Sequence, residues 1–187
     1  MTPSRFIRAM HPRTAIQPKA DAIARVLQSG WAGQWKIHGH RAQIHIPPPG
    51  DGSCLAYNRQ GALHRKKLPE EIDAELSRLF AREDGWTVID SEWLKGEDRI
   101  FVFDILRAGG VLNSSLTYAE RYEQIPRVYR SSCIETLPLL MTVSGCMAAV
   151  ESAPEFVEGL VFRALHTRGF QDTSIIRCRW PDRSPHA

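Results

Sequence analysis

The chain has 187 residues, of which 43% are hydrophobic and 24% are charged, so it can bury a core and form one domain. This composition excludes an intrinsically disordered chain, a collagen-like repeat and a disulfide-stapled miniprotein. Lysine and arginine outnumber aspartate and glutamate by 24 to 21, and the net charge of +3 neither establishes nor opposes nucleic-acid binding.

Neither the cysteines nor the N-terminus indicates an exported protein. The four cysteines lie far apart and form no C-x-x-C pair, so we expect reduced thiols and no zinc ribbon. No segment approaches about eighteen apolar residues in a row, and the first residues lack the apolar region of a signal peptide. We therefore expect a cytoplasmic protein with no membrane contact, in which residues 1–18 form a polar arm, 19–180 one domain and 181–187 a tail.

Hydrophobic spacing and turn residues divide the chain into helices and strands. In the first half of the chain, we predict a helix over 19–28, a hairpin with a long loop over 35–59, a helix from Pro69 to Phe80, and strands over 87–94 and 99–106. In the second half, we predict helices over 117–124 and 147–152 and strands over 159–165 and 174–180. The apolar segment over 134–143 suits either a strand or a buried helix. Helices set between antiparallel hairpins favour an α+β domain over a doubly wound parallel sheet.

A basic hexapeptide in the predicted hairpin is the first candidate for chemistry; it reads Lys36-Ile37-His38-Gly39-His40-Arg41. A lysine becomes a nucleophile when it loses its proton, which nearby cations or desolvation promote. A glycine lets the backbone approach a phosphate closely. Taken alone, this segment is more typical of a solvated strand end.

Five further polar motifs lie on or beside predicted strands, and their joint order is the informative signal. They are Asn58-Arg59-Gln60-Gly61, Ile89-Asp90-Ser91-Glu92-Trp93, Phe101-Val102-Phe103-Asp104-Ile105-Leu106, Glu158-Gly159-Leu160-Val161-Phe162-Arg163 and Arg177-Cys178-Arg179. From about Trp35 to Trp180, the set resembles the covalent nucleotidyltransferase superfamily of ATP-dependent DNA ligases, RNA ligases and mRNA capping enzymes. The resemblance implies an α+β, ATP-grasp-like adenylation core of antiparallel sheets flanked by helices, with a nucleotide pocket between the sheets.

The resemblance also implies roles for individual side chains. Lys36 would attack the α-phosphate of ATP and form a lysyl–AMP phosphoramidate, and His38 belongs to the same nucleotide-binding motif. Arg41 and Arg59 match arginines that contact the nucleotide and the 5′-phosphate of the nucleic acid. Glu92 matches the glutamate that binds the ribose.

Two further matches concern the base and the metal. Phe103 matches the aromatic side chain that stacks on the adenine, and an aromatic face holds a base by about 1–3 kcal/mol. Glu158 matches a glutamate associated with the divalent metal. Mg²⁺ or Mn²⁺ held by Glu158, with Asp90 or Glu92 as a second carboxylate, would neutralise the triphosphate.

The sequence departs from the family pattern at several positions. His38 stands where DNA ligases and capping enzymes have Asp, and K-x-H-G is similar to one branch of RNA ligases. Ser91 replaces a glycine. Arg163, Arg177 and Arg179 replace lysines, which keeps the positive charge but removes any general-acid role of a lysine at these three positions.

Ligases usually continue into an OB-fold domain whose basic motif orients the pyrophosphate, and we expect no OB fold here. The leading hypothesis is a minimal ATP-dependent polynucleotide ligase that seals nicked DNA or RNA, with a possible partner chain supplying the OB-like function. Two alternatives stay open. One is a GTP-dependent guanylyltransferase of the capping type, and the other is a catalytically impaired module that binds nucleotide or nucleic acid.

Overall fold

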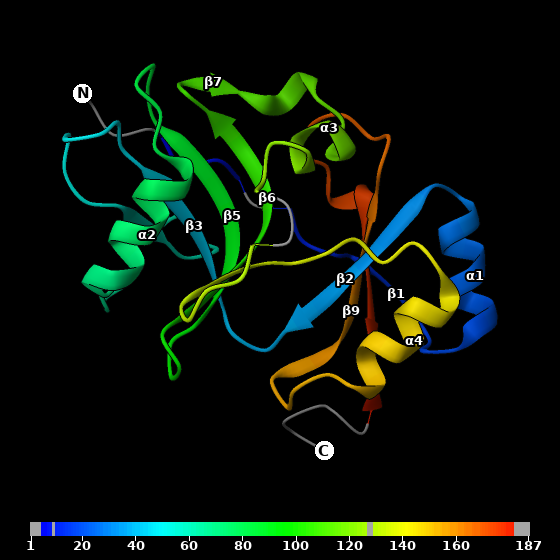
Figure 1. The fold of residues 1–187 in the computed structure, drawn as a ribbon. Helices are drawn as coiled ribbons and strands as arrows, with labels where there is room; N and C mark the ends of the chain where they lie inside the picture. Colours follow the sequence, from blue (N-terminus) through cyan, green and yellow to red (C-terminus); the bar gives the residue numbers. More distant parts are fainter. Residues whose placement is uncertain (1–4, 9, 127–128, 182–187) are drawn as a thin grey trace.

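The computed structural model describes residues 5–8, 10–126 and 129–181, which form two curled β-sheets with helices on their outer sides (Figure 1). Sheet A has the strand order β1-β10-β9-β2, and sheet B has the order β4-β3-β5-β6-β7, with β8 also paired to β6. The α+β architecture is therefore as expected. Two of the strand pairings, β1 with β10 and β6 with β8, are parallel, and the others between named strands are antiparallel.

The strands are β1 (Thr14–Ile16), β2 (Trp31–Ile37), β3 (His40–Ile46), β4 (Leu55–Tyr57), β5 (Thr87–Leu94), β6 (Arg99–Ala108), β7 (Val111–Leu112), β8 (Ile134–Thr136), β9 (Val157–Ala164) and β10 (Ile175–Arg179). The helices are α1 (Ala20–Gln28), α2 (Glu70–Phe80), α3 (Tyr118–Tyr122) and α4 (Val143–Glu151), with short 3₁₀ turns at Asn113–Ser115 and Asp172–Ser174. The apolar segment over 134–143 resolves into β8, an extended stretch and the start of α4.

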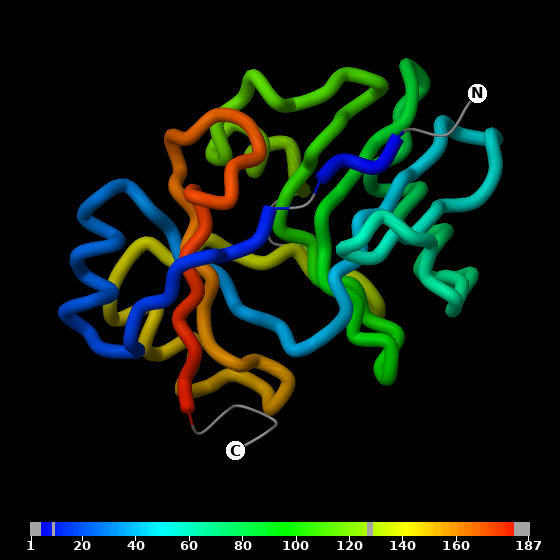
Figure 2. Tube along the Cα trace, turned by 180° about the vertical axis from the view of Figure 1, so that it is seen from behind, coloured from blue at the N-terminus to red at the C-terminus, as the bar shows by residue number. Residues whose placement is uncertain are grey.

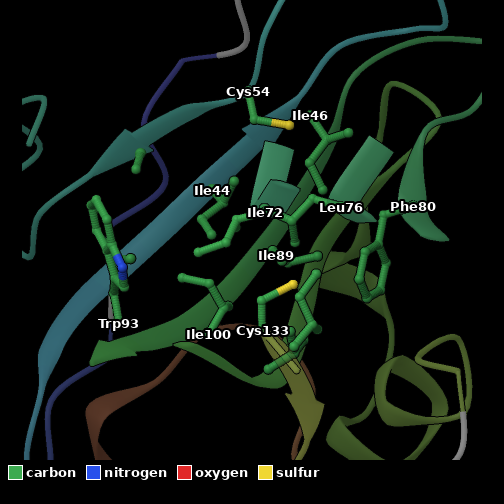
Figure 3. Close-up of a cluster of buried hydrophobic side chains, with 14 of the residues drawn as sticks. Ile44, Ile46, Cys54, Ile72, Leu76, Phe80, Ile89, Trp93, Ile100 and Cys133 are labelled. Atoms are coloured by element: carbon green, nitrogen blue, oxygen red, sulfur yellow. The ribbon is translucent and has the colours of Figure 1, made fainter. Parts of the chain in front are cut away.

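Sheet B is covered on one face by α2. The helix has Ile72, Leu76 and Phe80 at intervals of four residues, so these side chains share one face. That face packs against buried strand residues such as Ile44 and Ile89 (Figure 3). The acidic residues in the first turn of α2 lie at the positive end of its helix dipole, which they stabilise.

Sheet A is covered by α1 and α4. Ile23 of α1 and Val150 of α4 are buried in one apolar cluster with Leu160 and Phe162 of β9. The indole N–H of Trp35 donates to the backbone carbonyl of Ala149 at 2.9 Å, which ties β2 to α4. Strands β2, β9 and β10 of sheet A are therefore packed against these two helices.

The first part of the predicted hairpin, residues 35–46, is divided between the two sheets. β2 pairs with β9 in sheet A, whereas β3 pairs with β4 and β5 in sheet B. The crossing occurs at His38 and Gly39. A Cβ on Gly39 would lie 2.9 Å from the backbone carbonyl oxygen of Trp93, so only glycine allows this close approach.

The segment expected to be a polar arm packs against both sheets, and we call its described residues 5–8 and 10–16 the strap (Figure 2). The backbone of Ile7 exchanges two hydrogen bonds with the Gln43 side chain of β3. Residues 14–16 then form β1 beside β10. At the other end of the chain, the predicted tail lies outside the described residues apart from Pro181.

Other expectations concern cysteines and membranes. Cys54, Cys133, Cys146 and Cys178 are free and buried, as expected for reduced core thiols. Within the described ranges, no helix is both long and apolar enough to cross a membrane.

A buried ion pair connects β6 to α3. Arg121 donates to both carboxylate oxygens of Asp104, at 2.9 and 3.0 Å, and the two side chains are 1% and 0% exposed. Arg121 also donates to the backbone carbonyls of Leu116 and Gly169. The pair therefore joins sheet B to the segment that leads into β10.

We predict that Arg121→Met destabilises the chain by about 3–5 kcal/mol, because Asp104 would keep a buried charge without its partner. Urea denaturation monitored by circular dichroism measures the loss. The control is Arg25→Met, which breaks the exposed pair with Asp21 and should cost less than about 1 kcal/mol. Equal losses in the two variants would contradict the role assigned to the buried pair.

Candidate active site

A cavity of about 1190 Å³ lies between the two sheets. Its described lining includes seven lysine and arginine residues and four histidines, but only two carboxylates, Glu92 and Glu158. The net charge of +3 for the whole chain hides this concentration of positive charge. A concave, strongly cationic site favours a polyanionic ligand such as a nucleoside triphosphate.

Glu158 is the centre of the most tightly connected cluster in this cavity. Its carboxylate accepts a hydrogen bond from Lys36 Nζ at 2.5 Å and forms an ion pair with Arg179, whose Nε lies 2.9 Å away. The Nδ1 atom of His38 lies 2.6 Å from the other carboxylate oxygen. The sequence placed these side chains in three motifs up to 143 residues apart by chain number (36 to 179), and the fold brings all of them to one carboxylate.

Glu158 stays ionised despite its burial. Burial alone would raise the pKa of this carboxyl, but the hydrogen bonds from Lys36 and His38 and the charges of Lys36 and Arg179 outweigh it and lower the pKa. The side chains of Lys36 and Glu158 are 18% and 5% exposed, so water screens their interaction only in part.

The register of sheet A explains why these side chains meet. Lys36 of β2 lies opposite Gly159 of β9, and Gly159 lies opposite Arg179 of β10. Gly159 has a φ of 148°, and a Cβ there would lie 2.2 Å from the carbonyl oxygen of Cys178. A side chain at this position would therefore push β9 and β10 apart and disturb the cluster.

The opposite wall of the cavity carries a second ion pair. Arg41 donates to both carboxylate oxygens of Asp90, through Nε at 2.6 Å and through Nη2, and its Nη1 donates to the Met10 carbonyl at 2.9 Å. Burial alone would lower the pKa of Arg41, but the charge and hydrogen bonds of Asp90 outweigh it and raise the pKa. Arg41 is therefore held in one orientation, with the strap as its third partner.

Glu92 is the second carboxylate of the cavity and lies next to Arg41 in sheet B. Burial raises the pKa of Glu92 to about 7, although the charges of Arg41 and Lys36 act in the opposite direction. Glu92 therefore changes its protonation near neutral pH, and it can donate a hydrogen bond below that pH and accept one above it.

The apolar end of the cavity contains Phe103, on which the resemblance places the base. The guanidinium carbon of Arg163 lies 4.6 Å from the centre of the Phe103 ring, and that of Arg41 lies 5.3 Å from it. Both contacts are in the range of cation–π interactions. A base that stacks on Phe103 must therefore share or displace one of these guanidinium groups.

Arg163 is a site residue that the sequence assignment left out. It is 5% exposed, and its Nε and Nη1 have no hydrogen-bond partner. Gln34, also buried in the cavity lining, donates to the Leu137 carbonyl at 2.9 Å. The signal was available, because Arg163 ends the Glu158–Arg163 motif and Gln34 lies two positions before Lys36 on the same strand, but strand pairing was needed to show that they share a cavity.

Two predicted site residues lie farther from Glu158. Arg59 is exposed in the turn after β4, where it lines the cavity mouth. Arg177 lies opposite Val161 in sheet A but is exposed, and it lines an adjoining groove rather than the main cavity.

The carboxylates fit a magnesium site only in part. Mg²⁺ is usually held by one or two carboxylates together with substrate phosphates. Glu158 and Glu92 both face the cavity and suit this role, whereas both oxygens of Asp90 are bound by Arg41. No group of three or more His, Cys, Asp or Glu side chains placed to hold a metal occurs among the described residues.

Comparisons with known proteins concern the fold. No protein-family model matches the chain, and no curated protein sequence matches it. A solved structure of mycobacterial DNA ligase D complexed with ATP and MES is similar over 91% of this chain and 60% of that chain, with a TM-score of 0.56 and 16% identity.

Two other ligase structures are similar to this chain. The ligase domain of LigD from M. tuberculosis matches 89% of this chain and 59% of its own, with a TM-score of 0.59 and 14% identity. A Lig E DNA ligase, described as binding DNA with a minimal scaffold, matches 94% and 70%, with a TM-score of 0.54 and 11% identity. The chain therefore has the fold of a DNA ligase nucleotidyltransferase domain and spans about three fifths of the ligase D structures.

We predict that Glu92→Gln becomes more stable relative to the wild type as the pH rises from about 4.5 to 7. The folded-state pKa of Glu92, about 7, lies above its ordinary value of 4.5, so folding favours the protonated form. Its contribution to stability is complete below the unfolded pKa and is lost as the pH rises through the folded pKa. Urea unfolding of both proteins at pH 5 and pH 8 measures the difference, and a pH-independent difference would contradict the raised pKa.

Proposed function

We propose that the chain is an ATP-dependent polynucleotide ligase that forms a lysyl–AMP intermediate at Lys36. The contact of Glu158 with both Lys36 and Arg179 is the observation that carries this proposal, because it places a lysine and an arginine at one anionic oxygen. The ATP-bound DNA ligase D, which has the same fold, supports ATP as the nucleotide.

In this proposal, different cavity residues bind the base, the ribose and the α-phosphate of the nucleotide. The base enters the end formed by Phe103 and Arg163, whose unpartnered N–H groups donate to ring nitrogens or carbonyl oxygens of a base. Glu92 holds the ribose hydroxyls. The α-phosphate takes the position beside Lys36 and Arg179, where the carboxylate of Glu158 now accepts a hydrogen bond from Lys36 and forms an ion pair with Arg179.

Lys36 attacks the α-phosphorus after its ammonium group has lost a proton to water. Its nitrogen forms the phosphoramidate bond as the bond to the bridging oxygen breaks, and the electron pair leaves with pyrophosphate. A divalent ion held by Glu158, with Glu92 near it, would neutralise the phosphate charge. Arg179 stabilises the same charge by donating to phosphate oxygens.

The acceptor is a 5′-phosphate at a nick in DNA or RNA. Arg59 and Arg65 line the mouth of the cavity, where a polynucleotide backbone would meet exposed cations before it reaches Lys36. The 5′-phosphate takes the AMP from Lys36, and the 3′-hydroxyl then displaces AMP to join the strand.

We predict that α-labelled ATP with Mg²⁺ labels the wild-type chain covalently and leaves Lys36→Ala unlabelled. Denaturing electrophoresis separates the covalent label from bound nucleotide. Lys67→Ala is the matched control, because Lys67 is an exposed lysine outside the described cavity lining and should be labelled like the wild type. Labelling by GTP in place of ATP would favour the guanylyltransferase, and labelling of Lys36→Ala would contradict the assigned nucleophile.

The choice of acceptor is tested with nicked duplexes of DNA and of RNA, each with a labelled 5′-phosphate. We expect the chain to seal one of them in the presence of ATP and Mg²⁺, with Lys36→Ala inactive on both. A chain that takes the label but seals neither substrate would be a nucleotidyltransferase with another acceptor. A folded chain that binds nicked duplex but never takes the label would be a binding module.

A further inference from the structure

The turn that follows β4, residues 58–65, forms part of the cavity mouth. All of its residues except Gly61 line the cavity. The turn contains no carboxylate, and its leucine, Leu63, is 54% exposed. The other large apolar side chains that are exposed within the described ranges, Val111, Leu112 and Met141, lie outside the cavity lining. An exposed leucine at the mouth of a cationic cavity therefore needs an explanation of its own.

Hydrogen bonds and packing hold this turn in one conformation. The side-chain oxygen of Asn58 accepts from the backbone N–H of Ala62 at 3.1 Å, and the backbone N–H of Asn58 donates to the Ala62 carbonyl at 2.8 Å. Gly61 has a φ of 84°, and a Cβ there would lie 2.9 Å from the ring of Phe6 in the strap. The turn is therefore packed against the strap, and Leu63 extends from a fixed backbone.

The register of sheet B places Leu63 at the outer end of its cavity face. Asp90, Gln43 and Tyr57 form one directly paired row. Tyr57 in turn forms a bridge with Leu63. Paired residues point to the same face of a sheet, and Gln43 shares its face with Arg41, which lines the cavity. The row therefore runs from a buried ion pair outward to an exposed apolar side chain.

An apolar side chain set between cations suits a nucleic acid with an exposed base. Arg59 and Arg65 precede and follow Leu63 in the turn, and both are exposed. Arginines bind phosphates, but phosphates have no attraction for a leucine. Proteins that kink DNA insert leucine and similar side chains between base pairs, at the cost of unstacking them. At a nick this cost is lower, because one strand is already interrupted.

We propose that Leu63 packs against the base pair exposed at a nick in duplex DNA, so that the chain binds nicked DNA more tightly than continuous DNA. This assignment rests on the proposed function, in which a nicked duplex is the acceptor. Arg59 and Arg65 contact the backbone of either duplex and do not distinguish them. An apolar contact with base pairs favours DNA, since RNA duplexes are recognised mostly through 2′-hydroxyl and phosphate groups.

Binding by the unlabelled chain tests the proposal without requiring catalysis. Fluorescence anisotropy, at one salt concentration and without ATP, compares nicked and continuous DNA duplexes of the same sequence. The wild type should bind the nicked duplex about fivefold or more tightly, and Leu63→Gln should bind both duplexes as the wild type binds the continuous one. Leu63→Met keeps the apolar side chain and should keep the preference.

Met141→Gln is the matched control, because Met141 is also 54% exposed but lies outside the cavity lining. This variant should bind both duplexes like the wild type. A second measurement uses 2-aminopurine placed beside the nick, whose fluorescence rises when the base loses its stacking partner. The wild type should raise this fluorescence on binding, whereas Leu63→Gln should leave it unchanged.

Three results would overturn the assignment: equal binding of both duplexes by the folded wild type, an unchanged preference in Leu63→Gln, or a loss of affinity in Leu63→Gln that is the same for both duplexes. Circular dichroism verifies that each variant is folded. The proposed function fails separately, if ATP does not label Lys36. A chain that prefers nicked DNA through Leu63 but takes no label would keep the contact at the nick and lose the transfer reaction.

Discussion

The site depends on one buried carboxylate that is shared by several donors. Glu158 accepts a hydrogen bond from Lys36, forms an ion pair with Arg179 and contacts His38, and these four side chains come from three strands and the crossing between the sheets. A carboxylate buried alone would be costly and would take up a proton, whereas this one stays charged because its partners compensate it. The same compensation keeps the lysine and arginine near each other without repulsion in the absence of a phosphate.

The two-sheet architecture determines which other side chains share the cavity with this carboxylate. Because the chain leaves sheet A at His38 and enters sheet B two residues later, Lys36 and Arg41 lie on opposite walls of one cavity. The strap joins the walls, since Met10 binds Arg41 and β1 pairs with β10. The Arg121–Asp104 pair holds α3 on sheet B, and Arg121 also donates to the carbonyl of Gly169 in the segment that leads into β10 of sheet A. The distance between Lys36 and Arg41 is therefore determined by packing on both sides.

Local sequence patterns predicted most of the helices and the long strands, because apolar alternation and turn residues lie within the elements themselves. The order of the motifs suggested the fold, and the structural neighbours bear it out. The remaining features depend on pairing between strands that are distant in the sequence. The strand at Thr14–Ile16 has only three residues and forms through parallel pairing with residues 176–178, which no local signal indicates. Asp90 was expected near the metal, yet the β3–β5 register places it opposite Gln43, where its side chain binds Arg41.

The end of the cavity that contains Phe103 shows the same division between local pattern and tertiary pairing. Phe103 could be assigned from its motif, but the guanidinium of Arg163 against its ring and the missing partners of that arginine depend on how β6 packs beside β9. Buried polar groups without a hydrogen-bond partner are exceptions to the usual rule that such groups are paired, and a ligand can supply the missing partner. They are therefore more informative about function than the satisfied ion pairs around them.

The central claim is that Lys36 becomes covalently bonded to a nucleotide. The most direct measurement is peptide mapping by mass spectrometry after incubation of the wild-type chain with ATP and Mg²⁺ at neutral pH. The account predicts an adenylate on the peptide that contains Lys36, joined through an acid-labile phosphoramidate bond. An adenylate on a different residue, or an unmodified chain that is folded and binds ATP, would contradict it.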